Sequence, residues 1–379
     1  MKQQRGIAGP VLVVLVVLVL LGTGIWLIAR PSAGDAEAVT TVDCLGGSEK
    51  SGLLGDAEVQ RILRERFGLR PNFRERGSYA QVQTPVERLR ADGVDCLWPS
   101  SFSAQAIFES GGSDAFPDYL AEPVFQSPQV LYANREVAEG LLRSGIVARR
   151  ADAYFIVDMK RLLEELILRG RSWADVGVAV PAGPIIVASS DPAKSNSGMA
   201  LAQLELAILA TGDPYRPATA EQAKTALPRV RALIEAQGLM RPGSDSAFDQ
   251  WLIQGTGGLL AGYENQLLQW VAGRGGRVPE QIVTLYPEPT ILNEHPILAL
   301  TPEGRAFTAA MLDPEIQAIA ARSYGFRPGS PELEQSQGQG LAQAFPGVAL
   351  PGTAELKKTQ APNQEVTELL LRCFERGQC

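Results

Sequence analysis

Residues 185–198 have the sequence IIVASSDPAKSNSG, which is the most informative stretch of the chain. An apolar run (185–188) precedes a polar loop, and Leu201, Leu204 and Ile208 follow at helical spacing. This order predicts a strand, a loop and the N-terminus of a helix. The first N–H groups of a helix lack partners within it and carry partial positive charge, so the loop could cradle a polar ligand. An ordinary helix cap is the alternative, because Ser and Asn are favoured there.

The composition describes a globular chain with no preference for nucleic acids. Its 379 residues are 45% hydrophobic and 20% charged, which is enough for two compact domains. The net charge is −7, and no block of Lys and Arg with interleaved aromatic residues occurs. We therefore expect no nucleic-acid partner.

The N-terminus sets the compartment. Lys2 and Arg5 precede an uncharged stretch (9–29) of the length that spans a bilayer. We expect residues 1–30 to be a single-pass anchor that starts in the cytoplasm, followed by a linker over 31–40. The alternative is a signal peptide that is cleaved to give a secreted protein, although its apolar region would be shorter, at about 7–15 residues. Both place the body of the chain on the extracytoplasmic side of the membrane.

Four cysteines agree with that compartment, because an even number permits two disulfides under oxidising conditions. We expect Cys44 to pair with Cys96, since both lie at the ends of predicted strands, which leaves Cys373 with Cys379. Buried free thiols are the alternative. No Cys-x-x-Cys pair occurs and the chain has one histidine, so we expect no metal site.

Strands and helices alternate along most of the chain. Residues 39–45 and 94–98 have the apolar pattern of strands, and a helix is expected to start after Asp56 and to end at Gly68. This alternation predicts open parallel sheets with covering helices. Further segments are expected as an extended run over 124–133 that is broken at Ser127-Pro128, as helices over 135–145, 158–169, 220–237, 247–253 and 313–324, and as a loose strap over 330–363 before a helix at 365–376.

Small polar residues recur where predicted strands end. Each serine alone is well explained as a turn or cap residue. In open α/β sheets, however, ligands bind in the crevice at the carboxyl ends of strands, so their common position favours a binding site. These residues are Ser48, Ser78, Ser100, Ser101, Ser127, Ser195 and Ser197.

The chain resembles bacterial extracellular solute-binding proteins of the type II periplasmic binding protein class, related to those for sulfate, molybdate and phosphate-like solutes. The resemblance implies two lobes, each an open, mostly parallel sheet with covering helices. Lobe one would comprise 41–128 and 286–330, lobe two 129–285, and 331–379 would be a C-terminal strap and short helix. The motifs that carry it are Ser48-Glu49-Lys50, Gly77-Ser78, Trp98-Pro99-Ser100-Ser101, Ser127-Pro128, residues 191–198, Gly262-Tyr263-Glu264-Asn265-Gln266, Tyr286-Pro287-Glu288-Pro289, His295-Pro296, Asp313-Pro314-Glu315-Ile316-Gln317 and Tyr324-Gly325-Phe326-Arg327.

The resemblance also implies a ligand site between the lobes that is rich in neutral donors. Glu49 and Glu264 would repel an anion unless they point away from it. The implied ligand-binding residues are Ser48, Ser78, Ser100 and Ser101 from lobe one, Ser127 near the hinge, and Lys194, Ser195, Asn196, Ser197 and Tyr263 from lobe two.

The function implied is capture of a small polar, anionic solute by a membrane-anchored monomer that supplies an ABC-type permease, without cofactor or metal. One alternative is a sensory or assembly protein that kept the fold and lost the ligand. A second is an enzyme on the same fold, which is disfavoured because no Gly-x-Ser-x-Gly, Walker or dinucleotide motif occurs. We expect His295 to be structural and no residue to be catalytic.

Overall fold

A computed structural model of the chain describes residues 39–150, 154–254, 257–330 and 340–379. The expected anchor (1–30) and nearly all of the expected linker lie outside the described residues. No helix within the described ranges is both long and apolar enough to cross a bilayer. Residues Thr40–Cys379 form one compact unit.

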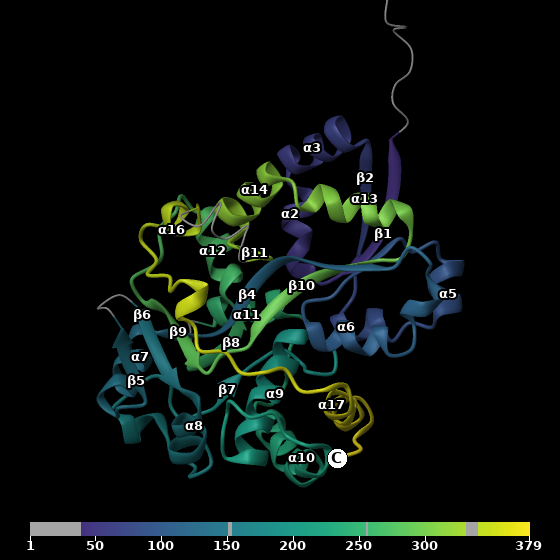
Figure 1. Cartoon of the computed structure of the whole chain (residues 1–379). Coiled ribbons are helices and arrows are strands. Elements are labelled where there is room, and N and C mark those ends of the chain that lie inside the picture. Colours follow the sequence, from purple (N-terminus) through teal and green to yellow (C-terminus); the bar gives the residue numbers. More distant parts are fainter. Residues whose placement is uncertain (1–38, 151–153, 255–256, 331–339) are drawn as a thin grey trace, which may run out of the picture. The chain divides into compact units, whose positions relative to one another are not determined.

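The described strands form one connected, mixed sheet. They are β1 (Thr40–Gly46), β2 (Leu69–Glu75), β3 (Cys96–Trp98), β4 (Leu120–Asn134), β5 (Val147–Arg150), β6 (Tyr154–Asp158), β7 (Val187–Ala188), β8 (Leu259–Tyr263), β9 (Ile282–Glu288), β10 (Leu292–Ala299) and β11 (Arg327–Pro328). Their order is β2-β1-β3-β10-β4-β9-β6-β5, with β11 and β8 also paired to β4, and β7 to β8 (Figure 1).

The prediction of mostly parallel sheets is wrong. Parallel pairing joins β1 to β2 and β3, β6 to β9, and β7 to β8. The strand β10, in contrast, is antiparallel to both β3 and β4, and β4 is antiparallel to β8 and β9. The physical reason is that β4 carries the chain out of the first lobe while β10 carries it back, so two neighbouring strands run in opposite directions.

The long strand β4 divides the sheet into two lobes. Its residues up to Pro128 pair with β10, and its residues from Gln129 onward pair with β8 and β9. The expected break at Ser127-Pro128 is therefore a change of partner within one continuous strand. The two crossings are bonded to each other, because Gln129 N donates to Ile291 O (2.8 Å) and Thr290 Oγ1 donates to Gln129 O (2.7 Å).

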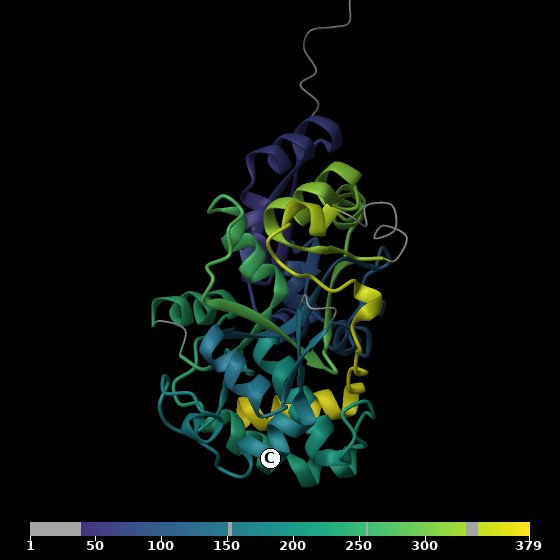
Figure 2. The same ribbon diagram turned by 90° about the vertical axis from the view of Figure 1, so that its left-hand side faces the viewer.

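Helices cover both lobes. Figure 1 shows α3 and α13 beside β1 and β2, and Figures 1 and 2 both place α17 beside α10. The α-helices are α2 (Ser51–Gly55), α3 (Ala57–Phe67), α4 (Ser78–Val82), α5 (Val86–Ala91), α6 (Phe102–Glu109), α7 (Arg135–Arg143), α8 (Met159–Arg161), α9 (Asn196–Thr211), α10 (Ala220–Glu235), α11 (Ser244–Ile253), α12 (Glu264–Ala272), α13 (Pro302–Met311), α14 (Pro314–Tyr324), α16 (Gly340–Ala344) and α17 (Gln364–Arg376). Shorter 3₁₀ or π segments are η1 (Ser48–Lys50), η2 (Ser113–Ala115), η3 (Leu162–Ile167), η4 (Trp173–Val176) and η5 (Thr353–Glu355).

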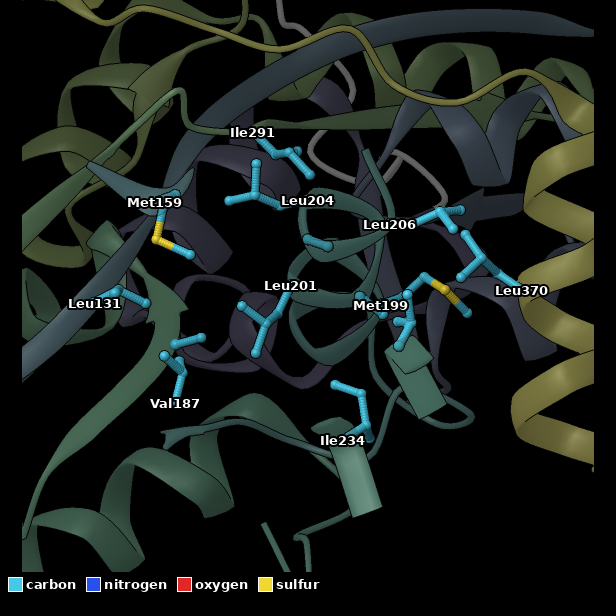
Figure 3. Packing of buried hydrophobic residues seen from close by; sticks show 14 of the residues in the cluster. Leu131, Met159, Val187, Met199, Leu201, Leu204, Leu206, Ile234, Ile291 and Leu370 are labelled. Carbon is cyan, nitrogen blue, oxygen red and sulfur yellow. The ribbon is translucent and has the colours of Figure 1, made fainter. Parts of the chain in front are cut away.

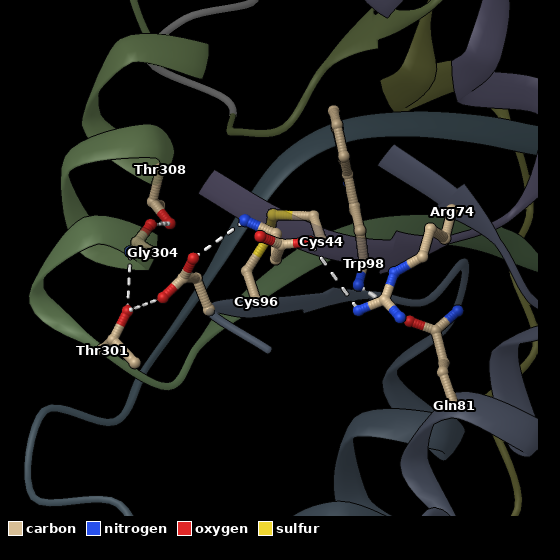
Figure 4. The surroundings of a disulfide bond; sticks show 10 residues. Cys44, Arg74, Gln81, Cys96, Trp98, Thr301, Gly304 and Thr308 are labelled. Carbon is tan, nitrogen blue, oxygen red and sulfur yellow. Dashed lines mark hydrogen bonds and ion pairs between the residues drawn. A yellow bond between two sulfur atoms is a disulfide. The ribbon is translucent and has the colours of Figure 1, made fainter. Parts of the chain in front are cut away.

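Both expected disulfides are confirmed. Cys44 and Cys96 face each other in neighbouring parallel strands, with 4.6 Å between their Cα atoms (Figure 4). Cys373 and Cys379 join the last turn of α17 to the residue at the end of the chain. The first bridge matters for the site, because the segments that follow β1 and β3 both line the cavity described below.

The helix α9 is buried on nearly every side, so it belongs to the core of lobe two. Figure 3 shows Leu201, Leu204 and Leu206 of α9 among Ile234 and Leu370 of neighbouring helices. A helix that is apolar all round is typical of a position inside the core. The sequence predicted one apolar face for this helix, whereas the structure buries residues on nearly all of its sides.

A glutamate in this buried helix makes folding stability depend on pH. Glu205 is 4% exposed, its Oε2 has no hydrogen-bond partner among the described residues, and burial raises the pKa of Glu205 to about 8. The folded state therefore keeps a proton that the unfolded state releases, and stability falls as the pH rises from about 4.5 to 8.

We predict that Glu205→Gln removes this dependence. The unfolding free energy of the variant minus that of wild type should be a few kcal/mol larger at about pH 8 than at about pH 5, because each unit of pKa shift corresponds to about 1.4 kcal/mol. Urea unfolding at both pH values tests this, with the exposed Glu139→Gln as the control. Equal pH slopes for wild type and Glu205→Gln would contradict the prediction.

Candidate functional site

A cavity of about 670 Å³ lies between the two lobes. Lobe one contributes η1, the end of β2, the start of α4 and Ser100 in the loop after β3, and lobe two contributes the starts of α9, α11 and α12. The lining residues are Gly47, Ser48, Glu49, Ser51, Glu75, Arg76, Gly77, Ser78, Ser100, Lys194, Ser195, Asn196, Pro242, Gly243, Ser244, Asp245, Ser246 and Tyr263.

Most of the residues singled out from the sequence come together here. Ser48, Ser78, Ser100, Lys194, Ser195, Asn196 and Tyr263 line the cavity.

Three of the singled-out serines do not line the cavity, and their hydroxyls make internal hydrogen bonds. Ser101 Oγ accepts from Ala104 N (3.3 Å) and caps α6. Ser127 Oγ donates to Asn265 Oδ1 (3.1 Å) and accepts from Asn265 N (3.2 Å). Ser197 Oγ lies 2.7 Å from Ser190 Oγ.

Helix N-termini without side-chain caps converge on the cavity from both lobes. The N-cap residues of η1, α4, α9 and α11 are Gly47, Gly77, Ser195 and Gly243, and none of the four makes a side-chain cap hydrogen bond within the described chain. No N-cap side chain satisfies the N–H groups of these first turns, and the dipoles of the longer helices α9 and α11 favour negative charge at their N-termini.

The loop before α9 folds back tightly on itself. A Cβ atom on Gly198 would lie 2.0 Å from Ser190 O, so this position requires glycine. Asp191 Oδ1 accepts from Ala193 N (3.0 Å), which turns the loop, and Lys194 Nζ lies 3.1 Å from Asp191 Oδ2. Ser195 is the N-cap residue by position, yet its hydroxyl does not cap the helix, so the ordinary-cap interpretation does not describe this loop.

Asn196 joins the lobes directly. Its Nδ2 donates to Ser100 O of lobe one (2.9 Å), and it also lies within hydrogen-bond distance of Asn293 Oδ1 (2.9 Å) and Tyr263 Oη (3.1 Å). The two lobes also lie close together at Gly77, where an added Cβ would lie 2.2 Å from Lys194 O. The structure is therefore closed at this edge of the cavity.

A buried ion pair supports the wall of lobe one. Lys50 is fully buried, and its Nζ donates to Glu49 Oε1 (2.5 Å) and Ser100 Oγ (2.6 Å). Burial alone would raise the pKa of Glu49, but the charge of Lys50 and the nearby imidazole of His295, whose Nδ1 lies 3.5 Å from Glu49 Oε1, hold it well below its usual range. Burial, reinforced by Lys50, lowers the pKa of His295 to about 4, so His295 is neutral at pH 7.

Glu264 points away from the cavity. Its carboxylate accepts from Arg327 Nε (2.7 Å) and from Tyr286 Oη (2.7 Å), and Glu264 is 2% exposed. The repulsion of an anion that the sequence suggested for Glu264 therefore does not arise, and the repulsion suggested for Glu49 is offset by Lys50.

The start of α11 differs from the expectation for that helix. That helix begins at Ser244 and not at residue 247, and it brings Asp245 to the cavity. Burial and the charge of Glu49 raise the pKa of Asp245 to about 6. A pattern that could have found this segment is the Gly-Ser pair, since Gly47-Ser48 and Gly77-Ser78 also begin helices at the cavity.

The described residues contain no group of three or more His, Cys, Asp or Glu side chains that could hold a metal ion. The donors that line the cavity are serine hydroxyls, backbone N–H groups, the Asn196 amide, the Tyr263 hydroxyl, and one arginine and one lysine at its exposed edge. Such an arrangement can bind a polar solute by hydrogen bonds.

No family model and no curated protein sequence matches the chain. Solved structures do match. They include the sulfate-binding protein SubI from Mycobacterium tuberculosis H37Rv (18% identity, TM-score 0.51, covering 82% of this chain and 93% of that one). A periplasmic thiamin binding protein matches with 11% identity, a TM-score of 0.55, and 92% and 99% coverage. A Thermotoga lettingae TMO ABC transporter solute binding protein bound with α-D-tagatose matches with 12% identity, a TM-score of 0.55, and 89% and 94% coverage.

The chain thus has the fold of the type II periplasmic solute-binding proteins, and the resemblance stated from the sequence is confirmed at the level of the fold. The names of these matched proteins refer to different solutes, so the comparisons show a common fold and indicate no particular ligand.

The close approach at Gly77 predicts how closure can be blocked. Gly77→Ala should push α4 away from Lys194 O and loosen the contact between Asn196 and Ser100. Backbone amide exchange at Met199 and the residues that follow it, where the N–H groups of α9 are hydrogen-bonded, should then speed up by about tenfold, which corresponds to about 1.4 kcal/mol. The matched control is Gly55→Ala, because a Cβ on Gly55 meets nothing within 4 Å. Unchanged exchange in Gly77→Ala would show that the close approach does not hold the lobes together.

Proposed function

We propose that the protein captures a small polar solute, with an anionic group, between its two lobes and delivers it to an ABC-type permease. The observation that carries this proposal is the convergence of helix N-termini without side-chain caps, from both lobes, on one cavity. A solute that contacts both lobes favours the closed arrangement, since it binds that state better than an open one.

We further propose that lobe one comprises residues 41–128 and 286–330, and lobe two residues 129–285. The change of partner of β4 after Pro128 supports the first boundary. In this arrangement Ser48, Ser78 and Ser100 form lobe one's half of the site, while Lys194, Ser195, Asn196 and Tyr263 form the other. The segments that carry these residues are held in place by hydrogen bonds of three serines outside the cavity lining, Ser101, Ser127 and Ser197.

The body of the protein is proposed to work outside the cytoplasmic membrane, attached by residues 1–30. Two disulfides fit that oxidising compartment, and the uncharged stretch over 9–29 fits a bilayer.

N-terminal sequencing of the mature protein tests the attachment. We predict an intact N-terminus in the membrane fraction. A mature chain that begins shortly after Ala38, recovered in the soluble fraction, would support the cleaved and secreted alternative.

A sensory or assembly role is the second candidate, and the C-terminal strap favours it. Helix α17 packs against α10 of lobe two and also against α6 of lobe one. The segment before it pairs with the hinge, where Thr290 N donates to Lys357 O (2.8 Å). Contacts of this kind restrain the opening that a transport cycle needs.

Solute binding separates these candidates. We predict that at least one compound from a panel of oxyanions, amino acids and sugars raises the melting temperature of the protein, because a solute that binds only the folded state stabilises it. Asn196→Ala should weaken binding of that compound by about tenfold or more, since it removes the contact that closes the cleft. Asn72→Ala changes an exposed amide outside the cavity and serves as the control. A panel without any shift would contradict capture.

A further inference from the structure

The charges around the cavity are not uniform. Glu75, Arg76 and Lys194 lie at its exposed edge, where solvent screens them. Lys194 is 64% exposed and is already paired with Asp191. Glu49 and Asp245, in contrast, are buried and half-buried carboxylates on the inner wall. The inner wall therefore determines which charge a bound solute meets.

The two inner carboxylates share a single cation, because the charge of Lys50 acts on Asp245 as well as on Glu49. Glu49 is balanced by Lys50, whose Nζ lies 2.5 Å away. In the part of the chain that the structure describes, no Lys, Arg or His forms an ion pair with Asp245. Its Oδ1 accepts from Gln266 Nε2 (2.9 Å), and Ser48 provides a further hydrogen bond. With His295 neutral, the inner wall carries one uncompensated negative charge at pH 7.

Stabilisation of its own helix does not explain why an acidic side chain lies at position 245. An acidic residue in the first turn commonly stabilises a helix through its dipole. Here the N-cap is Gly243 without a side-chain bond, and the Asp245 carboxylate bonds instead to α12 and to lobe one. Burial and the charge of Glu49 raise the pKa of Asp245, which means that a nearby cation would be stabilising. The carboxylate is thus oriented across the cavity and away from its own helix.

Resting on the function proposed above, we propose that the solute is amphoteric, with a protonated amine against Asp245 and an anionic group at the helix N-termini. A purely anionic solute would meet the net negative charge of the inner wall, where Lys50 alone faces the carboxylates of Glu49 and Asp245. An ammonium group would form charge-assisted hydrogen bonds with Asp245 while the anionic end accepts from the first turns of α9 and α11. A volume of about 670 Å³ accommodates both ends of such a molecule.

Matched pairs of probes test the amine. Taurine is compared with isethionate, and phosphoethanolamine with 2-hydroxyethyl phosphate, so that each pair differs by amine against hydroxyl. Isothermal titration of the full chain at about pH 7.5, with inorganic sulfate and phosphate alongside, should show about tenfold or greater preference for the amine in at least one pair. Asp245→Asn should reduce that preference to about threefold or less.

Controls separate the effect of Asp245 from general charge or folding. Asp249→Asn removes the same charge from an exposed position of α11 that does not line the cavity, and it should keep the preference. Asp245→Ser is a second variant in case Asp245→Asn does not fold, and circular dichroism checks both.

Each contrary result has a distinct meaning. Hydroxyl analogues or inorganic anions that bind as tightly as the amines would overturn the amphoteric solute and leave solute capture standing. An amine preference that survives in Asp245→Asn and Asp245→Ser would overturn the role of Asp245. Absence of binding by all these probes and by the broader panel would overturn both this inference and the proposed function.

Discussion

The closed arrangement depends on the side-chain amide of Asn196. It offers two N–H groups to three acceptors, Ser100 O, Asn293 Oδ1 and Tyr263 Oη, which lie on lobe one, a crossing strand and lobe two. A buried amide has to be satisfied, so these three groups are held at fixed distances from the start of α9. The helix itself is held by the apolar core of lobe two (Figure 3). Hydrophobic packing in one lobe thus determines where the other lobe is contacted.

The opposite wall is organised by charge. Lys50, Glu49 and Ser100 share hydrogen bonds in a site that is almost closed to water. Removing one charge from a buried pair leaves the other uncompensated, which is strongly destabilising. The segment after β1 is therefore tied to the segment after β3, and the inner surface that faces a solute is left with Asp245 as its unbalanced charge.

Local features were predictable from the sequence, and pairings between distant segments were not. The helix that Asp56 begins and Gly68 ends was confirmed, because its cap and its left-handed glycine act within a few residues. The loop around Ser195 was placed correctly for the same reason. The direction of β10 was not predictable, since it depends on where the chain returns from lobe two. The hydrogen bonds of Ser127 to Asn265 and the burial of Lys50 beside Ser100 also depend on partners far along the chain. Residue type alone favours exposure for both side chains.

The disulfide between Cys44 and Cys96 has a consequence for when the site becomes ordered (Figure 4). Oxidation joins the two strands whose ends lead to Ser48 and Ser100, so this wall of the cavity is ordered during folding. Under the proposed function, association of a solute with the oxidised chain would not have to supply the conformational entropy cost of ordering that wall. A reduced chain would have to order the same wall each time it bound a solute.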